Sequence, residues 1–222
     1  MKKLLFVIVL SVILAGCSTG NTENQEKDNK DQNTEQKEQV KKTDKNIKED
    51  VYVPNPQVTD DLNLVKVGET VTDAKGELTL KAYKNVNQTV QVGPVELLIK
   101  DVKVMHFVPA YSMIDFFHSY THDEEFDFVK VSVEAKNTSS DTIKFTPVAA
   151  LNMNSAEHKT WEDDIYLEEL GGEIEDNDVK KGNMGFILED TKEIKSVELL
   201  TSDAVDKDQK IIEKAKSIKV DF

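Results

Sequence analysis

The sequence predicts an all-β fold, an antiparallel β-sandwich with one or two short helices. Apolar residues alternate with polar residues in several runs, which is the period of a strand that buries one face. Clusters of turn-forming residues separate these runs, and no long alternation of strand and helix patterns indicates a parallel sheet. The apolar positions of the runs are Leu78, Leu80 and Ala82; Val95, Leu97 and Ile99; Val102 and Val104; Val129, Val131, Val133 and Ala135; Ile143 and Phe145; Met184, Phe186 and Leu188; Ile194 to Leu200; and Ile218, Val220 and Phe222.

Two local irregularities are predicted inside these runs. After Val95–Ile99 and Asp101, the alternation continues at Val102 and Val104 one residue out of phase. A change of phase of this kind predicts a β-bulge. Farther along, Lys181-Gly182 predicts a turn before the strand that follows it.

The best candidate for a hairpin is the pair of runs on either side of the turn Asn137–Asp141. Val129–Ala135 precedes this turn and Ile143–Phe145 follows it, and short alternating runs around a polar turn are typical of paired strands. We therefore expect these two strands to be neighbours.

Two segments are expected to be helical. The first runs from Ser112 to about His118, and the second from Ala204 to Ala215. Ser202 or Asp203 would cap the second helix, because short polar side chains accept hydrogen bonds from the free N–H groups of the first turn.

The N-terminus has the layout of a secretory signal. Lys2 and Lys3 precede an apolar run of eleven residues, Leu4–Leu14, which is about half of the roughly 20 that a helix needs to span the bilayer core. The sequence Leu14-Ala15-Gly16-Cys17 resembles the lipobox of bacterial lipoproteins. This resemblance implies cleavage after residue 16, a diacylglycerol on the Cys17 sulfur, and a lipid anchor at the extracytoplasmic face of the cell membrane.

Composition excludes several function classes. Cys17 is the only cysteine, so the mature chain has no disulfide, no cysteine nucleophile and no thiolate metal site. The formal net charge is −14 and there is no arginine, which makes nucleic acid a poor partner because phosphate neutralisation dominates such binding. The use of lysine alone suggests a Gram-positive source with an AT-rich genome. No cofactor is predicted.

Three parts are expected along the chain. Residues 1–16 form the cleaved signal, and residues 17–50 form the lipidated cysteine and a charged stalk that is too poor in apolar residues to fold. Pro54 and Pro56 mark the start of the folded part, and residues 51–222 are long enough for one domain.

A resemblance to a family extends this prediction. Val129–Ser139 with Ile143–Phe145, and Gly171–Ile174 with Lys181–Phe186, are similar to two hairpin elements in immunoglobulin-like domains of Gram-positive surface lipoproteins. The resemblance implies an immunoglobulin-like β-sandwich, a surface location and no catalytic residues. This chain departs from the pattern in lacking a proline before Gly182 and in carrying an aromatic-rich insertion, Pro109–Glu125.

The sequence offers few candidate residues for metal binding or catalysis. His118 and His122 are four residues apart, a spacing that would bring two imidazoles to one helix face as metal ligands in the 109–125 loop. No glutamate base lies between them, and the alternative is a loop that caps the core. Acidic groups such as Asp123-Glu124-Glu125 are interpreted as solvated turns rather than calcium sites. No G-x-S-x-G or Ser-x-x-Lys pattern indicates a nucleophile, so the chain is predicted not to be an enzyme.

Binding is therefore the leading functional hypothesis. Phe116, Tyr120 and Trp161 are the candidate ligand contacts, because aromatic side chains in polar surroundings often form binding surfaces. We expect a non-enzymatic surface module for an extracellular protein, a peptide or a small envelope ligand. Two alternatives stay open: a structural or envelope-stress lipoprotein without a pocket, and a divalent-metal-binding protein or metal-dependent hydrolase that uses the 109–125 loop.

Overall fold

The computed structural model describes residues 52–153, 157–189 and 194–222. They belong to one compact unit, Asp50–Phe222. The signal, Cys17 and the stalk lie outside the described residues. The buried residues of the two hydrophobic cores all lie between Val58 and Val220. This unit therefore contains the cores that it needs to fold without the segment before it.

The described chain is almost entirely β-structure, with one short helix. Its strands are β1 (Thr70–Asp73), β2 (Gly76–Val92), β3 (Val95–Pro109), β4 (Phe126–Asn137), β5 (Ile143–Phe145), β6 (Ala150–Met153), β7 (His158–Thr160), β8 (Gly172–Ile174), β9 (Val179–Ile187), β10 (Ser196–Leu200), β11 (Ala204–Val205), β12 (Ile211–Glu213) and β13 (Ser217–Asp221). The helical elements are η1 (Tyr111–Met113), α1 (Ile114–Phe117) and η2 (Trp161–Asp163). The helix predicted from Ser112 to about His118 is confirmed as the short helix α1, which directly follows η1.

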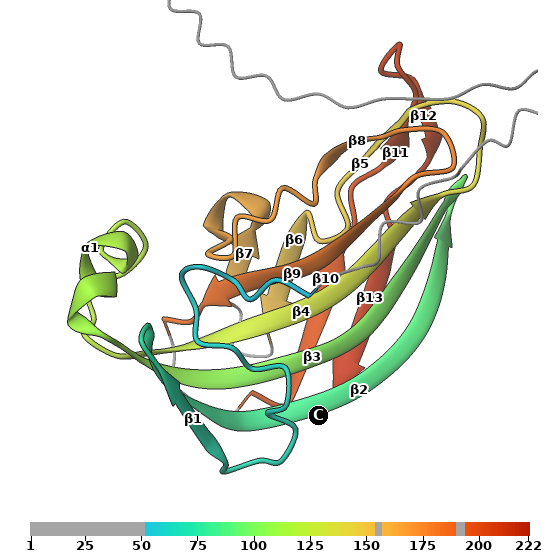
Figure 1. Ribbon diagram of the computed structural model, residues 1–222. Helices are drawn as coiled ribbons and strands as arrows, with labels where there is room; N and C mark the ends of the chain where they lie inside the picture. The colour runs from blue at the N-terminus through green and yellow to red at the C-terminus, as the bar shows by residue number, and fades with distance from the viewer. Residues whose placement is uncertain (1–51, 154–156, 190–193) are drawn as a thin grey trace, which may run out of the picture. The chain divides into compact units, whose positions relative to one another are not determined.

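The strands form three antiparallel sheets. The largest has the order β1-β2-β3-β4-β9, and two smaller sheets have the orders β13-β10-β6-β7 and β12-β11-β5-β8. The long strands β2, β3 and β4 curl into half a barrel, and the smaller sheets lie against its inner side (Figure 1). The predicted all-β, antiparallel sandwich is confirmed.

Alternation along the central strands explains which residues enter the main core. Val129, Val131 and Val133 of β4 point to the smaller sheets and are buried in this core, whereas Lys130 and Ser132 point to the opposite face. The predicted bulge is confirmed, because the register between β3 and β4 shifts between Ile99 and Asp101.

The expected hairpin of β4 and β5 is wrong. β4 pairs with β3 and β9, whereas β5 pairs with β8 and β11 in a different sheet. The buried side-chain amide of Asn137 donates hydrogen bonds to the carbonyl oxygens of Asp141 and Ile174, at 2.7 and 3.1 Å. These bonds tie the turn to the end of β8, so the chain crosses from one sheet to the other.

The helix predicted at Ala204–Ala215 is also wrong, since β11 and β12 form a hairpin there. The Asp206 carboxylate accepts hydrogen bonds from the backbone N–H groups of Asp208 and Lys210, both at 2.9 Å. Gln209 adopts a left-handed φ of 62°. An aspartate that binds its own backbone just ahead favours a tight turn over a helix.

The turn predicted at Lys181-Gly182 is wrong as well. Both residues lie inside β9 and pair with β4, where Gly182 is opposite Val133. Gly182 is small because the Glu168 carboxylate occupies the space that a β-carbon would need. The glycine marks a close approach within a strand rather than a turn.

Candidate functional site

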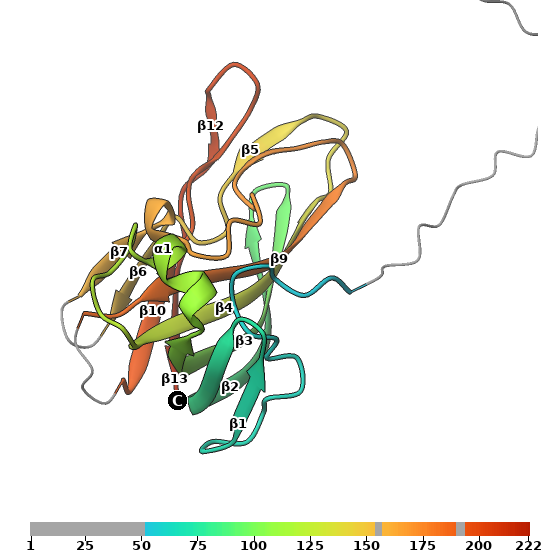
Figure 2. The same ribbon diagram turned by 60° about the vertical axis from the view of Figure 1, so that its left-hand side comes forward.

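The outer face of the large sheet carries a segment that we call the strap, Tyr52–Leu64. It runs across β9, β4 and β3 on the side away from the smaller sheets (Figures 1 and 2). Val58 and Leu64 of the strap are buried in a second core, which contains the phenylalanine side chains at one end of the sheet. Thr59, just before Asp61, ties the strap to the β1–β2 hairpin, because its hydroxyl lies 2.9 Å from Asp73 Oδ1 and 3.0 Å from the Gly76 carbonyl oxygen.

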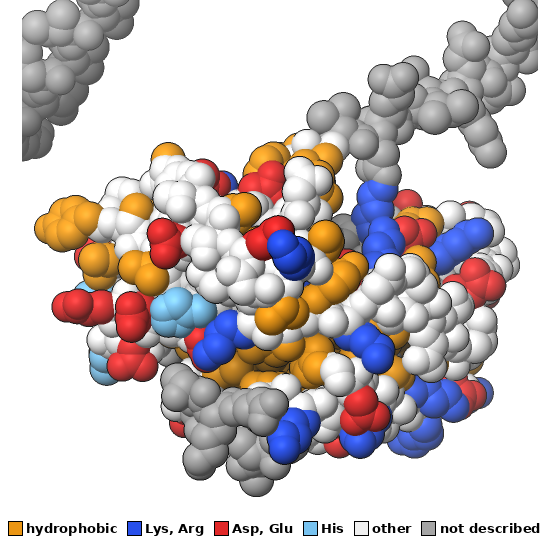
Figure 3. Space-filling model, turned by 90° about the horizontal axis from the view of Figure 1, so that it is seen from below, with side chains coloured by type: hydrophobic (Ala, Val, Ile, Leu, Met, Phe, Trp, Pro, Cys, Tyr) orange, Lys and Arg blue, Asp and Glu red, His pale blue; other side chains and the backbone are white. Residues whose placement is uncertain are grey.

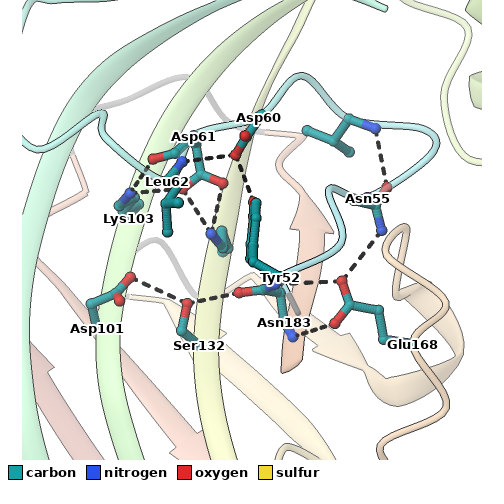
Figure 4. A network of polar contacts seen from close by, with 12 residues as sticks. Tyr52, Asn55, Asp60, Asp61, Leu62, Asp101, Lys103, Ser132, Glu168 and Asn183 are labelled. Carbon is teal, nitrogen blue, oxygen red and sulfur yellow. Dashed lines mark hydrogen bonds and ion pairs between the residues drawn. The ribbon is translucent and has the colours of Figure 1, made fainter. Parts of the chain in front are cut away.

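A buried ion triad holds the middle of the strap to the sheet. The Asp61 carboxylate accepts hydrogen bonds from the Nζ atoms of Lys103 on β3 and Lys130 on β4, all at 2.7 Å (Figure 4). The exposed fractions of the three residues are 3%, 3% and 6%. Burial by itself would raise the pKa of Asp61, but the charges of the two lysines lower it below the usual value.

Next to this triad is a groove of about 410 Å³. Its floor contains what we call the polar row, Asp101 of β3, Ser132 of β4 and Asn183 of β9, which are aligned across three neighbouring strands. The Ser132 hydroxyl lies 2.8 Å from Asn183 Oδ1 and 3.4 Å from Asp101 Oδ1 (Figure 4). The row therefore presents oxygen acceptors side by side.

The strap supplies an apolar wall to the same groove. Tyr52, Val53 and Leu62 line it, and their exposed fractions are 48%, 77% and 55%. Exposed apolar side chains that gather at one concave place are typical of binding surfaces. The groove thus combines a polar floor with an apolar wall.

The third side of the groove comes from the segment before β8. Glu168 lines the groove, and its Oε2 accepts a hydrogen bond from the Asn183 N–H at 2.8 Å. Behind it, Asp164 Oδ1 accepts hydrogen bonds from the N–H groups of Gly185 and Tyr166, at 2.8 and 3.0 Å. Burial raises the pKa of Asp164 to about 6, although these two hydrogen bonds act in the opposite direction and lower it.

Two glycines of β9 let this segment pack so closely. A β-carbon on Gly185 would lie 2.6 Å from the Tyr166 ring, and one on Gly182 would displace the Glu168 carboxylate. The Tyr166 ring packs near Phe128 of the second core, with centroids 6.4 Å apart. The side of the groove near β9 therefore depends on two positions that have no side chain.

The chain is related over its whole length to a bacterial protein. It is 43% identical to the uncharacterized protein YdhF of Bacillus subtilis (strain 168), with 100% of each chain covered. The chain belongs to the YdhF family. Residues 1–18 match the model for the prokaryotic membrane lipoprotein lipid attachment site, and this range includes Cys17. The protein is therefore a membrane-anchored lipoprotein.

Two more distant similarities extend this comparison. The chain is 26% identical to the SPbeta prophage-derived uncharacterized lipoprotein YonS of the same organism, over 76% of this chain and 74% of that protein. The crystal structure of a functionally unknown protein from Listeria monocytogenes EGD-e aligns with a TM-score of 0.46 and 13% identity, over 66% of this chain and 87% of that one. Within residues 52–153, 157–189 and 194–222, no helix is both long and apolar enough to cross a membrane.

The aromatic residues predicted from the sequence lie elsewhere in this YdhF-family chain. Phe116 and Tyr120 are together, with ring centroids 5.5 Å apart, and both pack against the second core. Trp161 is 57% exposed in η2, and no ring contact within the described residues joins it to the other two. None of the three lines the groove.

The predicted histidine pair is exposed at the end of the domain. The ring centroids of His118 and His122 are 6.5 Å apart. Acidic and histidine side chains gather at the end that carries α1 (Figure 3). No group of three or more histidine, cysteine, aspartate or glutamate side chains in the described part of the chain is arranged to hold a metal ion.

The sequence prediction missed the polar row and the strap. The polar residues that alternate with the valines of β4 were used only as evidence for a strand that buries one face. Lys130 and Ser132 alternate with fully buried residues, as the polar residues of any half-buried strand do, so the sequence carries no local signal for them. The partners of Lys130 on the strap are distant in sequence, and alternation does not reveal them.

Proposed function

We propose that the domain is a non-enzymatic binding module that holds a peptide or a small envelope ligand in the groove beside the strap. The observation that carries this proposal is the combination of an apolar wall of exposed side chains with a polar floor in one cavity of about 410 Å³. Such a surface fits an amphipathic ligand, whose apolar part lies on the wall and whose polar groups bind the row.

The composition of the groove supports binding without catalysis. None of the four histidines of the chain lines it, so no imidazole base stands beside the Ser132 hydroxyl. That hydroxyl is engaged with Asn183 at 2.8 Å. The predicted immunoglobulin-like relationship stays a prediction, because the confirmed statement is the coarser one of an antiparallel β-sandwich.

A pull-down from envelope extract tests the binding proposal. The soluble domain, residues 51–222, is compared with a Leu62→Asp variant, which places a charge on the apolar wall at an exposed position. Val67→Asp is the matched control, because Val67 is 58% exposed but does not line the groove. We expect the wild-type and control proteins to retain the same ligand and Leu62→Asp to lose it. Equal retention by all three proteins would place binding elsewhere.

We propose further that the domain is displayed on the extracytoplasmic face and that the lipid determines location alone. A Cys17→Ser full-length variant is then expected to appear folded in the culture medium, because its anchor is gone while its cores are intact. Cell fractionation with circular dichroism of the released protein measures both. A variant that stayed membrane-bound, or was released unfolded, would contradict this division of roles.

A further inference from the structure

We infer that the groove recognises its ligand through a primary ammonium group, which binds the carboxylate of Asp101. This inference rests on the proposed function and names the chemistry of the ligand.

Most charged groups at the groove already have strong partners. Lys103 and Lys130 share Asp61 in the buried triad. Lys100 forms an ion pair with Glu134 at 3.0 Å. Glu168 accepts the Asn183 N–H at 2.8 Å and lies 3.4 Å from the side-chain amide of Asn55.

Asp101 differs from all of these. Within the described residues, the one hydrogen-bonding neighbour of its carboxylate is Ser132 Oγ at 3.4 Å, whose proton is closer to Asn183, and it has no ion pair. It lies on the groove floor and is partly exposed. Among the carboxylates that line the groove, Asp101 therefore has the fewest hydrogen bonds and ion pairs. Because a ligand can reach it, a cationic group would form its strongest new interaction there.

The neighbours of Asp101 match the geometry of an ammonium group. An ammonium has three N–H donors and no acceptor. The polar row offers the Asp101 carboxylate, the lone pairs of the Ser132 hydroxyl and the second lone pair of Asn183 Oδ1, on adjacent strands about 4.8 Å apart.

The apolar wall indicates what is attached to the ammonium. Tyr52, Val53 and Leu62 face the same cavity as the polar row. A ligand with an ammonium beside an aliphatic group, such as the amino terminus or a lysine of a peptide, therefore satisfies both surfaces. An amino sugar supplies the same ammonium with a more polar skeleton.

Nuclear magnetic resonance titration tests this inference with defined probes. The ¹⁵N-labelled domain, residues 51–222, is titrated with L-leucinamide and with N-acetyl-L-leucinamide, which lacks the charge. D-glucosamine and N-acetyl-D-glucosamine form the matched pair for a sugar. We expect leucinamide to shift the signals of Asp101, Ser132 and Asn183 with a dissociation constant on the order of 10 mM, and its acetylated form to bind at least tenfold more weakly.

Two further measurements isolate the charge. Asp101→Asn is expected to weaken leucinamide binding at least tenfold, whereas Asp115→Asn, an exposed aspartate on α1 outside the groove, leaves it unchanged. The wild-type protein is also titrated at pH 6.5 and at pH 9.5, because the amine loses its proton near pH 8. Binding that disappears at the higher pH supports the inference even if the Asp101 variant does not fold.

The possible outcomes are separable. Glucosamine binding that needs Asp101 supports the ammonium and assigns it to a sugar rather than a peptide. Equal binding of N-acetyl-L-leucinamide in the groove overturns the ammonium inference but leaves the proposed function in place. If neither amine shifts the polar row at tens of millimolar, the inference is wrong, and the envelope pull-down decides the proposed function independently.

Discussion

The two faces of the large sheet use the same strands for opposite purposes. On the inner face, side chains such as Val129 and Val131 are completely buried against the smaller sheets. On the outer face, the alternate positions carry Lys130 and Ser132, which are almost as buried but are charged or polar. Burial alone explains the first choice. It does not explain the second, because charge is costly to bury.

The buried charged residues of the outer face position the strap rather than stabilise the fold. A buried ion pair rarely stabilises a fold more than well-packed apolar residues of similar volume. The triad of Asp61, Lys103 and Lys130 instead fixes where the strap lies, and the strap provides the apolar wall of the groove. The predictions below test this contrast between the two faces.

The largest effect is expected from Asp61→Ala. This change leaves two buried lysines without their counter-charge, so the free energy of unfolding should fall by roughly 3–5 kcal/mol. Urea denaturation measures it. Asp60→Ala is the control, because Asp60 is only partly buried and its carboxylate accepts hydrogen bonds from the Tyr52 hydroxyl and the Leu62 N–H.

A triple variant of the triad separates its role in placing the strap from its role in the stability of the fold. Asp61→Leu, Lys103→Met and Lys130→Met together replace the triad with apolar side chains. We expect this variant to recover the stability that Asp61→Ala loses, but to bind ligand differently because the strap is no longer fixed by directed bonds. A triple variant as unstable as Asp61→Ala would show that the charges themselves hold the fold.

The strands of this fold were accessible from the sequence, but their partners were not. Alternation located the strand at Val129–Ala135 and the bulge near Asp101, because the side-chain period follows directly from which face is buried. The neighbour of a strand depends on long-range contacts. The crossing to β5 is set by the Asn137 amide, which binds a carbonyl 37 residues away.

The candidate site was less accessible for the same reason. The prolines at 54 and 56 predicted where the folded part begins, but they did not reveal that Asp61 reaches lysines 42 and 69 residues away. The aromatic residues that the sequence singled out, Phe116, Tyr120 and Trp161, lie outside the groove. A groove floor made from polar positions of three strands has no local pattern that distinguishes it from a solvated face.

A smaller effect is expected at the glycines of β9. Gly185→Ala should lower the free energy of unfolding by about 1–3 kcal/mol, because its β-carbon would meet the rigid, buried Tyr166 ring. Gly182→Ala should cost less, since it displaces the flexible end of Glu168. Thermal unfolding of both variants measures this, and Gly182→Ala should perturb ligand binding more than it perturbs stability. The reverse order of stabilities would contradict the packing at this side of the groove.

An effect of similar size to that of Gly185→Ala, but confined to a pH window, is expected at Asp164. Burial raises the pKa of this carboxyl to about 6 in the folded state, above its ordinary value of 3.8. The folded protein therefore binds the proton more tightly, and stability from this group is fully present below about pH 4 and is lost as the pH rises through 6. Asp164→Asn keeps an oxygen for the N–H groups of Gly185 and Tyr166 but cannot ionise. Relative to the wild type, the variant should gain about 2 kcal/mol between pH 4 and pH 7.5.

Urea denaturation of both proteins at several pH values measures this difference, and Glu162→Gln on the exposed η2 serves as the control. Carboxyl groups with lowered pKa, such as Asp61, act in the opposite direction, since they lose stability as the pH falls. Their contribution is common to both proteins and cancels in the comparison. A difference that does not change with pH would show that the two backbone hydrogen bonds outweigh burial and keep Asp164 charged, so that the carboxylate at the side of the groove carries its charge under all physiological conditions.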